Sequence, residues 1–317
     1  MTEANREWNT YQNLIRKMER ETGVLSLYDE INQLTKEETY SAAALTLYNQ
    51  LDSVFRVLEE QETAEAIERR YQLFERRNIL RRNGEMFSPA YQALSKKVDV
   101  LNQSMEEKLY ARIEQTPSWA GLYYLKGRIE SYVQRRLIAY QRPYAIYRKK
   151  FAARWGQHPL GRYIEAIVAS VNQMKVGQLY EDYQADDLQG NAVSVAEQIK
   201  GKWAVIDLWA SWCSPCRNRS RWLIPLYERY KDCGFTIVGI ARERKISDWQ
   251  AALRQEKYPW LQLLELNEKY GIWLKHGMNH AAGGMFLIDP QGRIAAVDPA
   301  VEDLEKMLEK TLGQPAQ

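Results

Sequence analysis

The sequence has little of the chemistry on which several protein classes depend. It contains three cysteines and three histidines in 317 residues. A small secreted fold held together by disulfides has more cysteines, in an even number. A structural zinc site needs four ligands, and beyond one close cysteine pair the chain offers only these candidates: Cys233, His158, His276 and His280. We therefore expect no metal site and no disulfide framework. The cysteines are expected to serve in a reaction rather than in a structural role.

Long apolar runs and a strong charge of one sign are also missing. No run is long enough to cross a bilayer, and the N-terminal segment MTEANREWNTYQN lacks the apolar stretch of a signal peptide. We expect a chain that is not transmembrane, and that either stays in the cytoplasm or has lost a targeting segment. The net charge of +3 is too small to indicate a nucleic-acid partner.

The first 174 residues have the pattern of helices. Apolar residues recur three and four positions apart, which places them on one face of a helix. Three such sets are Leu47, Leu51, Val54 and Leu58; Leu94, Val98, Leu101, Met105 and Leu109; and Ile164, Ile167, Val168 and Val171. Turn signals fall near Gly23, residues 82–84, Pro117, Pro143 and Pro159. We predict an all-α domain over residues 1–174 and assign it no role.

Residues 175–317 follow a different pattern. Short apolar runs at 204–209, 235–240, 285–288 and 294–297 predict strands, the last two joined in a hairpin at 289–292. Helices are expected between the first two strands, near 248–255, and from 301 until Gly313. Alternating strands and helices indicate an α/β domain with a mostly covered sheet.

The cysteine pair Cys213-Ser214-Pro215-Cys216 follows the first strand and opens a helix. At positions i and i+3 both sulfurs lie on one face, close enough for a disulfide. Free N–H groups and the helix dipole favour a thiolate at Cys213, and Pro215 suits a first turn that needs no N–H from it. We predict that Cys213 attacks and that Cys216 resolves the mixed disulfide.

Asp207 lies six residues before Cys213, inside the apolar strand. A carboxylate there is costly without a role or a partner. One interpretation is a buried proton carrier that accepts the proton of Cys216, directly or through water. The other is an acid near a strand end that reaches solvent.

The segment Val205-Ile206-Asp207-Leu208-Trp209-Ala210-Ser211-Trp212-Cys213-Ser214-Pro215-Cys216-Arg217 resembles the active-site segment of the TlpA-like thioredoxin family, and the resemblance extends over about residues 176–312. It implies an α/β thioredoxin-like fold, a central mixed sheet flanked by helices, here preceded by the all-α domain. It also implies a reductase of client-protein disulfides in the bacterial periplasm or cell envelope. Such an enzyme is recharged by an upstream thiol electron donor and needs no cofactor beyond its redox-active cysteine pair. The oligomeric state stays open.

The sequence departs from the family at two places. Gly283, followed by Gly284, stands where the family has a cis-proline facing the cysteines, which puts client binding in doubt. The resemblance implies that Trp212, Ser214 and Pro215 contact the client together with these glycines. Arg219 and Arg221 replace an acid and a proline; with Arg217 they either make Cys213 more acidic or form a solvated helix face.

Other functions fit the sequence less well. A thiol peroxidase of the related alkyl hydroperoxide reductase group wants threonine or serine where this chain has Ala210. A Cys–His hydrolase would use His276 or His280, but nothing marks its remaining groups. A non-catalytic binding or scaffold protein with a degenerate client site remains an alternative because of Gly283. Cys233 is expected to be incidental.

Overall fold

The computed structural model describes residues 3–61, 63–278 and 283–313. The chain forms two compact units, Met1–Tyr123 and Tyr124–Gln317, which are described here one at a time. This division into compact units does not test the expected domain boundary between residues 174 and 175, so that boundary stays a prediction. None of the helices in the described ranges is both long enough and apolar enough to cross a membrane.

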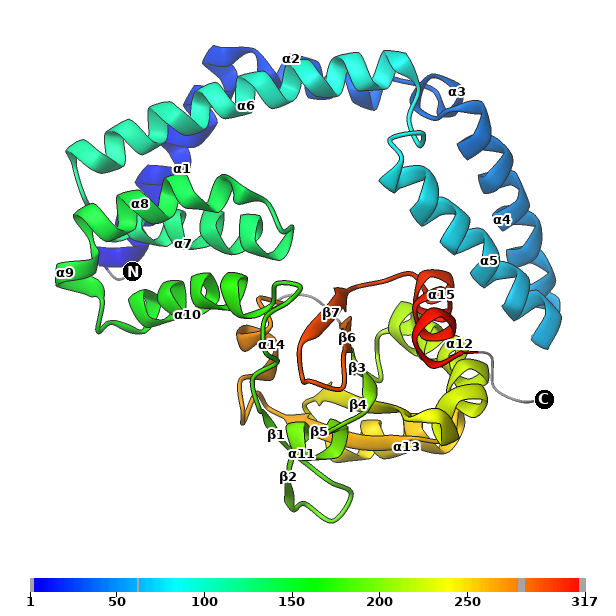
Figure 1. The fold of residues 1–317 in the computed structure, drawn as a ribbon. Helices are drawn as coiled ribbons and strands as arrows, with labels where there is room; N and C mark the ends of the chain where they lie inside the picture. Colours follow the sequence, from blue (N-terminus) through cyan, green and yellow to red (C-terminus); the bar gives the residue numbers. More distant parts are fainter. Residues whose placement is uncertain (1–2, 62, 279–282, 314–317) are drawn as a thin grey trace. The chain divides into compact units, whose positions relative to one another are not determined.

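The first unit is built from helices (Figure 1). α4 and α5 pack as a hairpin, and α1 and α2 lie along the long α6. The bounds are α1 (Glu3–Thr22), α2 (Val24–Asn32), α3 (Lys36–Thr39), α4 (Ala42–Glu60), α5 (Ala64–Arg82) and α6 (Pro89–Gln115), after which α7 (Trp119–Gln134) leads into the second unit. The expected apolar faces of α4 and α6 are the buried ones, with Leu47, Leu51, Val98 and Met105 in their cores. The all-helical prediction is confirmed for this region.

Local signals set the ends of these helices. Thr35 and Glu38 form a reciprocal capping box at the start of α3. The Ser41 and Ser88 hydroxyls cap α4 and α6, and Pro89 occupies the first turn of α6. Gly23 takes the left-handed conformation, φ 73°, that separates α1 from α2.

The second unit joins further helices to a sheet. Beyond α7 the helices are η1 (Ile138–Tyr140), α8 (Gln141–Lys150), α9 (Ala152–Trp155) and α10 (Pro159–Gln173). α10 packs on the short helix α14 (Ile272–Lys275). At the start of α10, Gly161 approaches the α9 backbone so closely that an added Cβ would stand 2.1 Å from the Trp155 carbonyl oxygen.

The sheet has seven strands in the order β2-β1-β5-β4-β3-β6-β7. β3, β4 and β5 run parallel, and the other neighbouring pairs are antiparallel. The bounds are β1 (Gln184–Asp186), β2 (Ala192–Ser194), β3 (Trp203–Trp209), β4 (Phe235–Glu243), β5 (Leu261–Leu266), β6 (Gly284–Ile288) and β7 (Ile294–Val297). The sheet is therefore mixed, as the resemblance implied.

Helices cover both faces of this sheet. Apolar residues of α12 (Ser214–Tyr230), α13 (Ile246–Glu256) and α15 (Val301–Leu312) form one core with alternate residues of β3, including Val205 and Trp209. α11 (Val195–Ile199) and α14 form the other core with Ile206 and Leu208. The alternation along β3 places Asp207 on the α12 face. This arrangement confirms the predicted thioredoxin-like fold class.

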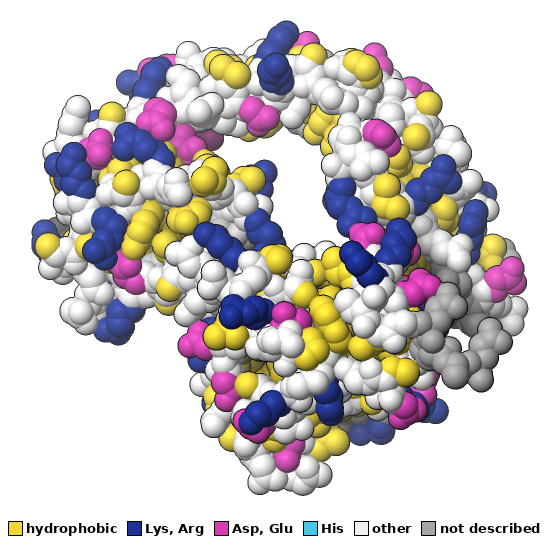
Figure 2. Space-filling model, viewed as in Figure 1, with side chains coloured by type: hydrophobic (Ala, Val, Ile, Leu, Met, Phe, Trp, Pro, Cys, Tyr) yellow, Lys and Arg dark blue, Asp and Glu magenta, His cyan; other side chains and the backbone are white. Residues whose placement is uncertain are grey.

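The sequence predicted four strands and missed three. β5 was overlooked because Gln262 and Glu265 interrupt its apolar run, although both are buried. β1 and β2 have only three residues each, too short to show a pattern in the sequence, and form a hairpin around 187–191. Within each unit, basic and acidic side chains are intermingled on the side that Figure 2 shows.

Substitution of Gly161 by alanine tests the close contact between α9 and α10. The added Cβ meets backbone atoms, which cannot turn aside as a side chain would, so we expect G161A to lower the free energy of unfolding by about 1–3 kcal/mol. Gly127, exposed in α7 with nothing within 4 Å of an added Cβ, is the matched control. G127A should be neutral or stabilising, by up to about 1 kcal/mol. Urea unfolding measures both; equal effects would contradict the packing argument.

Candidate functional site

The cysteine pair lies at the junction between β3 and α12. Cys213 and Cys216 form a disulfide, with their Cα atoms 5.3 Å apart. Cys213 is the N-cap residue of α12, and its Sγ accepts the backbone N–H of Cys216 at 3.2 Å. Pro215 occupies the first turn, as expected. In the reduced form the same N–H groups and the helix dipole would face a thiolate at Cys213.

Burial does not rank the two sulfurs in this oxidised form. Cys213 is 5% exposed and Cys216 is 7% exposed, so both sulfurs are equally buried. What separates them is their surroundings. Cys213 adjoins Trp212, whose indole is 64% exposed, whereas Cys216 lies beneath Gly283.

Gly283 lies close to the disulfide, where the resemblance placed it. A Cβ added there would stand 2.0 Å from the Leu208 carbonyl oxygen and 3.0 Å from the Cys216 Sγ. A side chain of any kind therefore meets β3 backbone at this place, and only glycine permits the approach. Gly284 is less constrained, because a Cβ there would meet the flexible end of Met278.

Asp207 does not reach solvent, which removes one of its two interpretations. Its side chain is 1% exposed and pairs with Arg219, whose Nη2 lies 2.9 Å from Oδ1. The Ser220 hydroxyl donates to Oδ2 and also lies 3.0 Å from the Cys216 carbonyl oxygen. The carboxylate is thus buried, ion-paired and connected through Ser220 to the turn that carries Cys216.

Arg217, Arg219 and Arg221 of α12 are neither a solvated face nor unpaired charges beside Cys213. Arg217 and Arg221 both bind Glu256, the last residue of α13, whose side chain is 1% exposed. Arg219 binds Asp207. From the sequence we considered only a more acidic Cys213 or a solvated helix face. The carboxylates that bind these arginines come from distant segments, so the sequence did not reveal them.

Glu243 and Arg217 hold the segment ahead of Cys213. Glu243, at the end of β4 and 3% exposed, accepts both the backbone N–H and the hydroxyl of Ser211. Arg217 donates to the Ser211 carbonyl oxygen at 3.2 Å. Burial raises the pKa of the Glu243 carboxyl, and the Ser211 hydrogen bonds oppose that rise. Ser211 is therefore fixed from both sides, two residues before the reactive cysteine.

Tyr258 and Gln262 complete the buried polar surroundings. Tyr258 donates to the Arg217 carbonyl oxygen at 3.2 Å, and burial raises the pKa of its hydroxyl. Gln262 accepts the Trp209 indole N–H at 3.1 Å and lies over Gly239, where a Cβ would clash with its amide. Sequence reasoning missed these residues and Glu243. For Glu243 one signal was present: it ends a strand parallel to β3, so it lies at the same sheet edge as the cysteines.

The histidine candidates are not part of this site. His276 packs against Phe286 and Tyr180 in the core on the opposite face of the sheet from the disulfide. Its Nδ1 donates to the Ile272 carbonyl oxygen at 2.7 Å, so its Nε2 accepts the Tyr180 hydroxyl at 2.8 Å. Both ring nitrogens of His276 are used in these hydrogen bonds, so His276 cannot act as the base for a catalytic cysteine. His280 lies outside the described residues.

Cys233 is exposed in η2 (Lys231–Cys233), which follows the C-terminal end of α12. The helix separates it from the pair by roughly 25 Å, at about 1.5 Å per residue. Within the described ranges, no group of three or more His, Cys, Asp or Glu side chains could hold a metal ion.

With this geometry in place, comparison with known proteins decides the family. The model of the AhpC/TSA family matches residues 176–297. This segment of the chain belongs to the AhpC/TSA family of thioredoxin-superfamily domains. The assignment confirms the resemblance inferred from the residues around Cys213 and Cys216.

Among curated proteins the chain is similar to the thiol-disulfide oxidoreductase ResA of Bacillus thuringiensis (strain Al Hakam), 26% identical over 76 residues, 24% of this chain and 43% of the relative. The chain thus spans less than half the length of the curated relatives it matches first. Solved structures include the thioredoxin domain of a thiol-disulfide oxidoreductase from Bacteroides vulgatus, 31% identical over 44% of this chain and 99% of that one, TM-score 0.40. A thiol:disulfide interchange protein from Bacteroides sp. is also 31% identical, over 44% and 91%, TM-score 0.40.

The Asp207–Arg219 pair predicts a coupling that a double-mutant cycle can measure. R219A leaves a buried carboxylate whose remaining partner in the described ranges is Ser220, so we expect it to lower the free energy of unfolding by about 1–3 kcal/mol. In the D207N background the same substitution should cost much less. Urea unfolding of the four proteins gives the coupling; a value near zero would mean that the pair contributes nothing.

His276 predicts a pH dependence of stability. Burial lowers its pKa from 6.5 to about 4, so between these values the unfolded chain binds a proton that the folded chain excludes. Stability is present in full above pH 6.5 and falls, by roughly 3 kcal/mol, as the pH drops through this range. H276Q should remove that part of the slope. Unfolding measured across this pH range tests the prediction. Identical slopes of stability against pH for the original chain and H276Q would refute it.

Proposed function

We propose that the chain is a thiol–disulfide oxidoreductase that reduces disulfides of client proteins. The observation that carries the proposal is the Cys213–Cys216 disulfide at the first turn of α12, with the Cys213 sulfur accepting a backbone N–H beside an exposed Trp212. The names of the relatives support the same activity. No cofactor is needed, because the cysteine pair itself carries the two electrons.

The first step is attack by the Cys213 thiolate on one sulfur of a client disulfide. The client S–S bond breaks, a Cys213–client disulfide forms, and the released client thiolate takes a proton from solvent. Cys213 is the attacking residue in this proposal because it caps α12, where the free N–H groups stabilise a thiolate.

The second step is resolution by Cys216. Its thiol gives up a proton and attacks the Cys213 sulfur, so the Cys213–client bond breaks and the client leaves as a dithiol after protonation. Two electrons and two protons have then passed to the client, and the pair is a disulfide again. We assign the acceptance of the Cys216 proton to Asp207, along a path past Ser220, which contacts both Asp207 and the Cys216 carbonyl. An upstream thiol donor would restore the dithiol.

The client site in this proposal surrounds the pair. Trp212 offers an exposed indole to apolar client residues, and Ser214 and Pro215 adjoin it on the first turn of α12. Gly283 and Gly284 offer backbone on the Cys216 side, where an extended client peptide could pair. By the family resemblance we propose the periplasm or cell envelope as the location.

One observation favours a second candidate, a binding or scaffold protein in which the pair does not turn over. Gly283 replaces the cis-proline that the family uses to fix a client peptide, and glycine does not hold the backbone in that way. A reversible redox couple and trapped clients separate the two candidates.

The reduction potential of the Cys213–Cys216 couple is the first measurement, followed through Trp212 fluorescence in graded thiol buffers. A reductase should show a reversible two-electron transition near or below roughly −270 mV. C216S should then accumulate mixed disulfides with clients, because the resolving thiol is gone. The C213S/C216S double variant is the control and should trap none. An absent transition, with the same partners bound by the double variant, would replace the reductase by the scaffold.

A further inference from the structure

The outer edge of β6 loses its partner strand just before the glycines that lie beside the disulfide. β7 pairs with β6 up to Val297, and Asp298 then hydrogen-bonds to Met285. Pro299 follows and has no N–H to donate, and α15 begins two residues later. Backbone groups alternate sides along a strand, so the next position on this edge is Gly283, which β7 does not reach.

Asp298 fixes the first turn-free stretch of β6 with both its main chain and its side chain. Its N–H donates to the Met285 carbonyl oxygen at 2.7 Å, and its Oδ1 accepts the Met285 N–H at 2.8 Å. On the opposite edge of β6, Gly284 pairs with Leu208 of β3. The two residues that follow Gly283 are therefore held from both sides.

The backbone of Asp298 has the left-handed conformation, and so has that of the residue that binds its side chain. Their φ angles are 46° for Asp298 and 56° for Arg136, and Asp298 Oδ2 lies 2.7 Å from Arg136 Nη2. Arg136 stands just past the end of α7, a place where a left-handed residue is usually glycine. Residues with a side chain rarely adopt this conformation. Two of them joined by their charged groups indicate a positional role for both.

The ion pair itself contributes little to the stability of the fold. Arg136 is 46% exposed and Asp298 is 43% exposed, and pairs of such exposure are weak. What the pair does is orient the carboxylate. Because Oδ2 faces Arg136, Oδ1 is directed to the Met285 N–H.

We propose that Asp298, oriented by Arg136, is a positioning residue for the client site. It fixes the backbone at Gly283 and Gly284 from the neighbouring strand, whereas the cis-proline of the family fixes its own residue through its ring. This role rests on the proposed reduction of client disulfides. It adds to the client site one residue from the end of β7 and one from the end of α7.

Two disulfide reagents with the same leaving group separate this backbone site from the cysteine pair. One is an extended peptide whose single cysteine carries nitrothiobenzoate, and the other is dithiobis(nitrobenzoate), which has no peptide backbone. The Cys213 thiolate of the reduced full chain forms a disulfide with either reagent, and the broken S–S bond releases one coloured nitrothiobenzoate anion. Cys216 then displaces the bound group as a thiolate and closes the Cys213–Cys216 disulfide. The rate of the first release is measured.

D298G removes the carboxylate and keeps a residue that accepts the left-handed backbone. It should lower the rate with the peptide reagent by about tenfold, the effect of losing one hydrogen bond that holds the site. The rate with dithiobis(nitrobenzoate) should stay that of the original chain. D298N keeps an oxygen for the Met285 N–H and tolerates the left-handed backbone, so it should restore most of the peptide rate. R136G should show a smaller loss, again with the peptide reagent alone.

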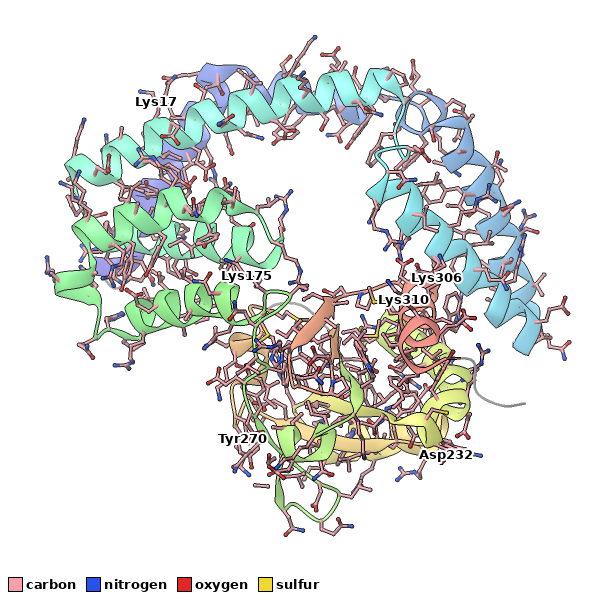
Figure 3. All side chains as sticks on the ribbon, viewed as in Figure 1. Lys17, Lys175, Asp232, Tyr270, Lys306 and Lys310 are labelled. Carbon is pink, nitrogen blue, oxygen red and sulfur yellow. A yellow bond between two sulfur atoms is a disulfide. The ribbon has the colours of Figure 1, made fainter. Side chains whose placement is uncertain are left out.

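The controls lose an exposed charge elsewhere in the same unit. Figure 3 labels both positions: Asp232 in η2, past the end of α12, and Lys175, which follows α10 and donates to Asn172. D232A and K175A should react with both reagents as the original chain does, and thermal unfolding confirms that each variant is folded.

Two results for D298G would overturn the role of Asp298. An unchanged peptide rate would show that the carboxylate does not hold the client site. An equal loss with both reagents would place its effect on the cysteine pair or on the fold as a whole. If the reduced original chain reacts with neither reagent, the proposed redox function itself fails, and the role of Asp298 fails with it.

Discussion

Strand β3 is hydrogen-bonded to neighbours on both sides, and the redox site depends on this constraint. Its residues pair with β4 from Trp203 to Trp209 and with β6 from Ala204 to Leu208. A strand held on both sides ends at a fixed place, and only residues 210–213 lie between it and α12. The position of the first turn of α12, and so of both sulfurs, follows from the sheet register rather than from the loop.

The same constraint explains why charge can be buried beside the pair. Because β3 alternates its side chains, Asp207 must face α12, where no water reaches it. Arg219 and Ser220 are the groups that α12 supplies to it. One turn away, Arg217 binds Glu256 and the Ser211 carbonyl, so the arginines of α12 connect the helix to β3, to α13 and to the segment before Cys213.

Much of the fold and the position of the redox site could be predicted from the sequence. The remaining features could not be predicted, for physical reasons. Apolar runs revealed β3, β4, β6 and β7, and the spacing of Cys213 and Cys216 after a strand revealed the site, because these signals are local. The sequence did not reveal β5, because the polar residues that interrupt it are accommodated by contacts outside the strand. Gln262 Oε1 accepts the Trp209 indole N–H, and Glu265 Oε1 accepts the backbone N–H groups at 270–271, while Gln262 Nε2 and Glu265 Oε2 have no partner in the described structure. The sequence also did not reveal that Arg217 and Arg221 bind Glu256, because Glu256 lies on another helix.

Glu256 shows how closely these charges depend on one another. It is the last residue of α13, where the helix dipole disfavours a carboxylate, and its side chain is almost fully buried. Two guanidinium groups offset both costs, and each of them would in turn lose the Glu256 carboxylate if that residue were replaced. None of the three can change alone without leaving a charge poorly compensated in a site of low exposure. The arginines that distinguish α12 from its family are therefore better explained by the carboxylates they bind than by an effect on the cysteine thiolate.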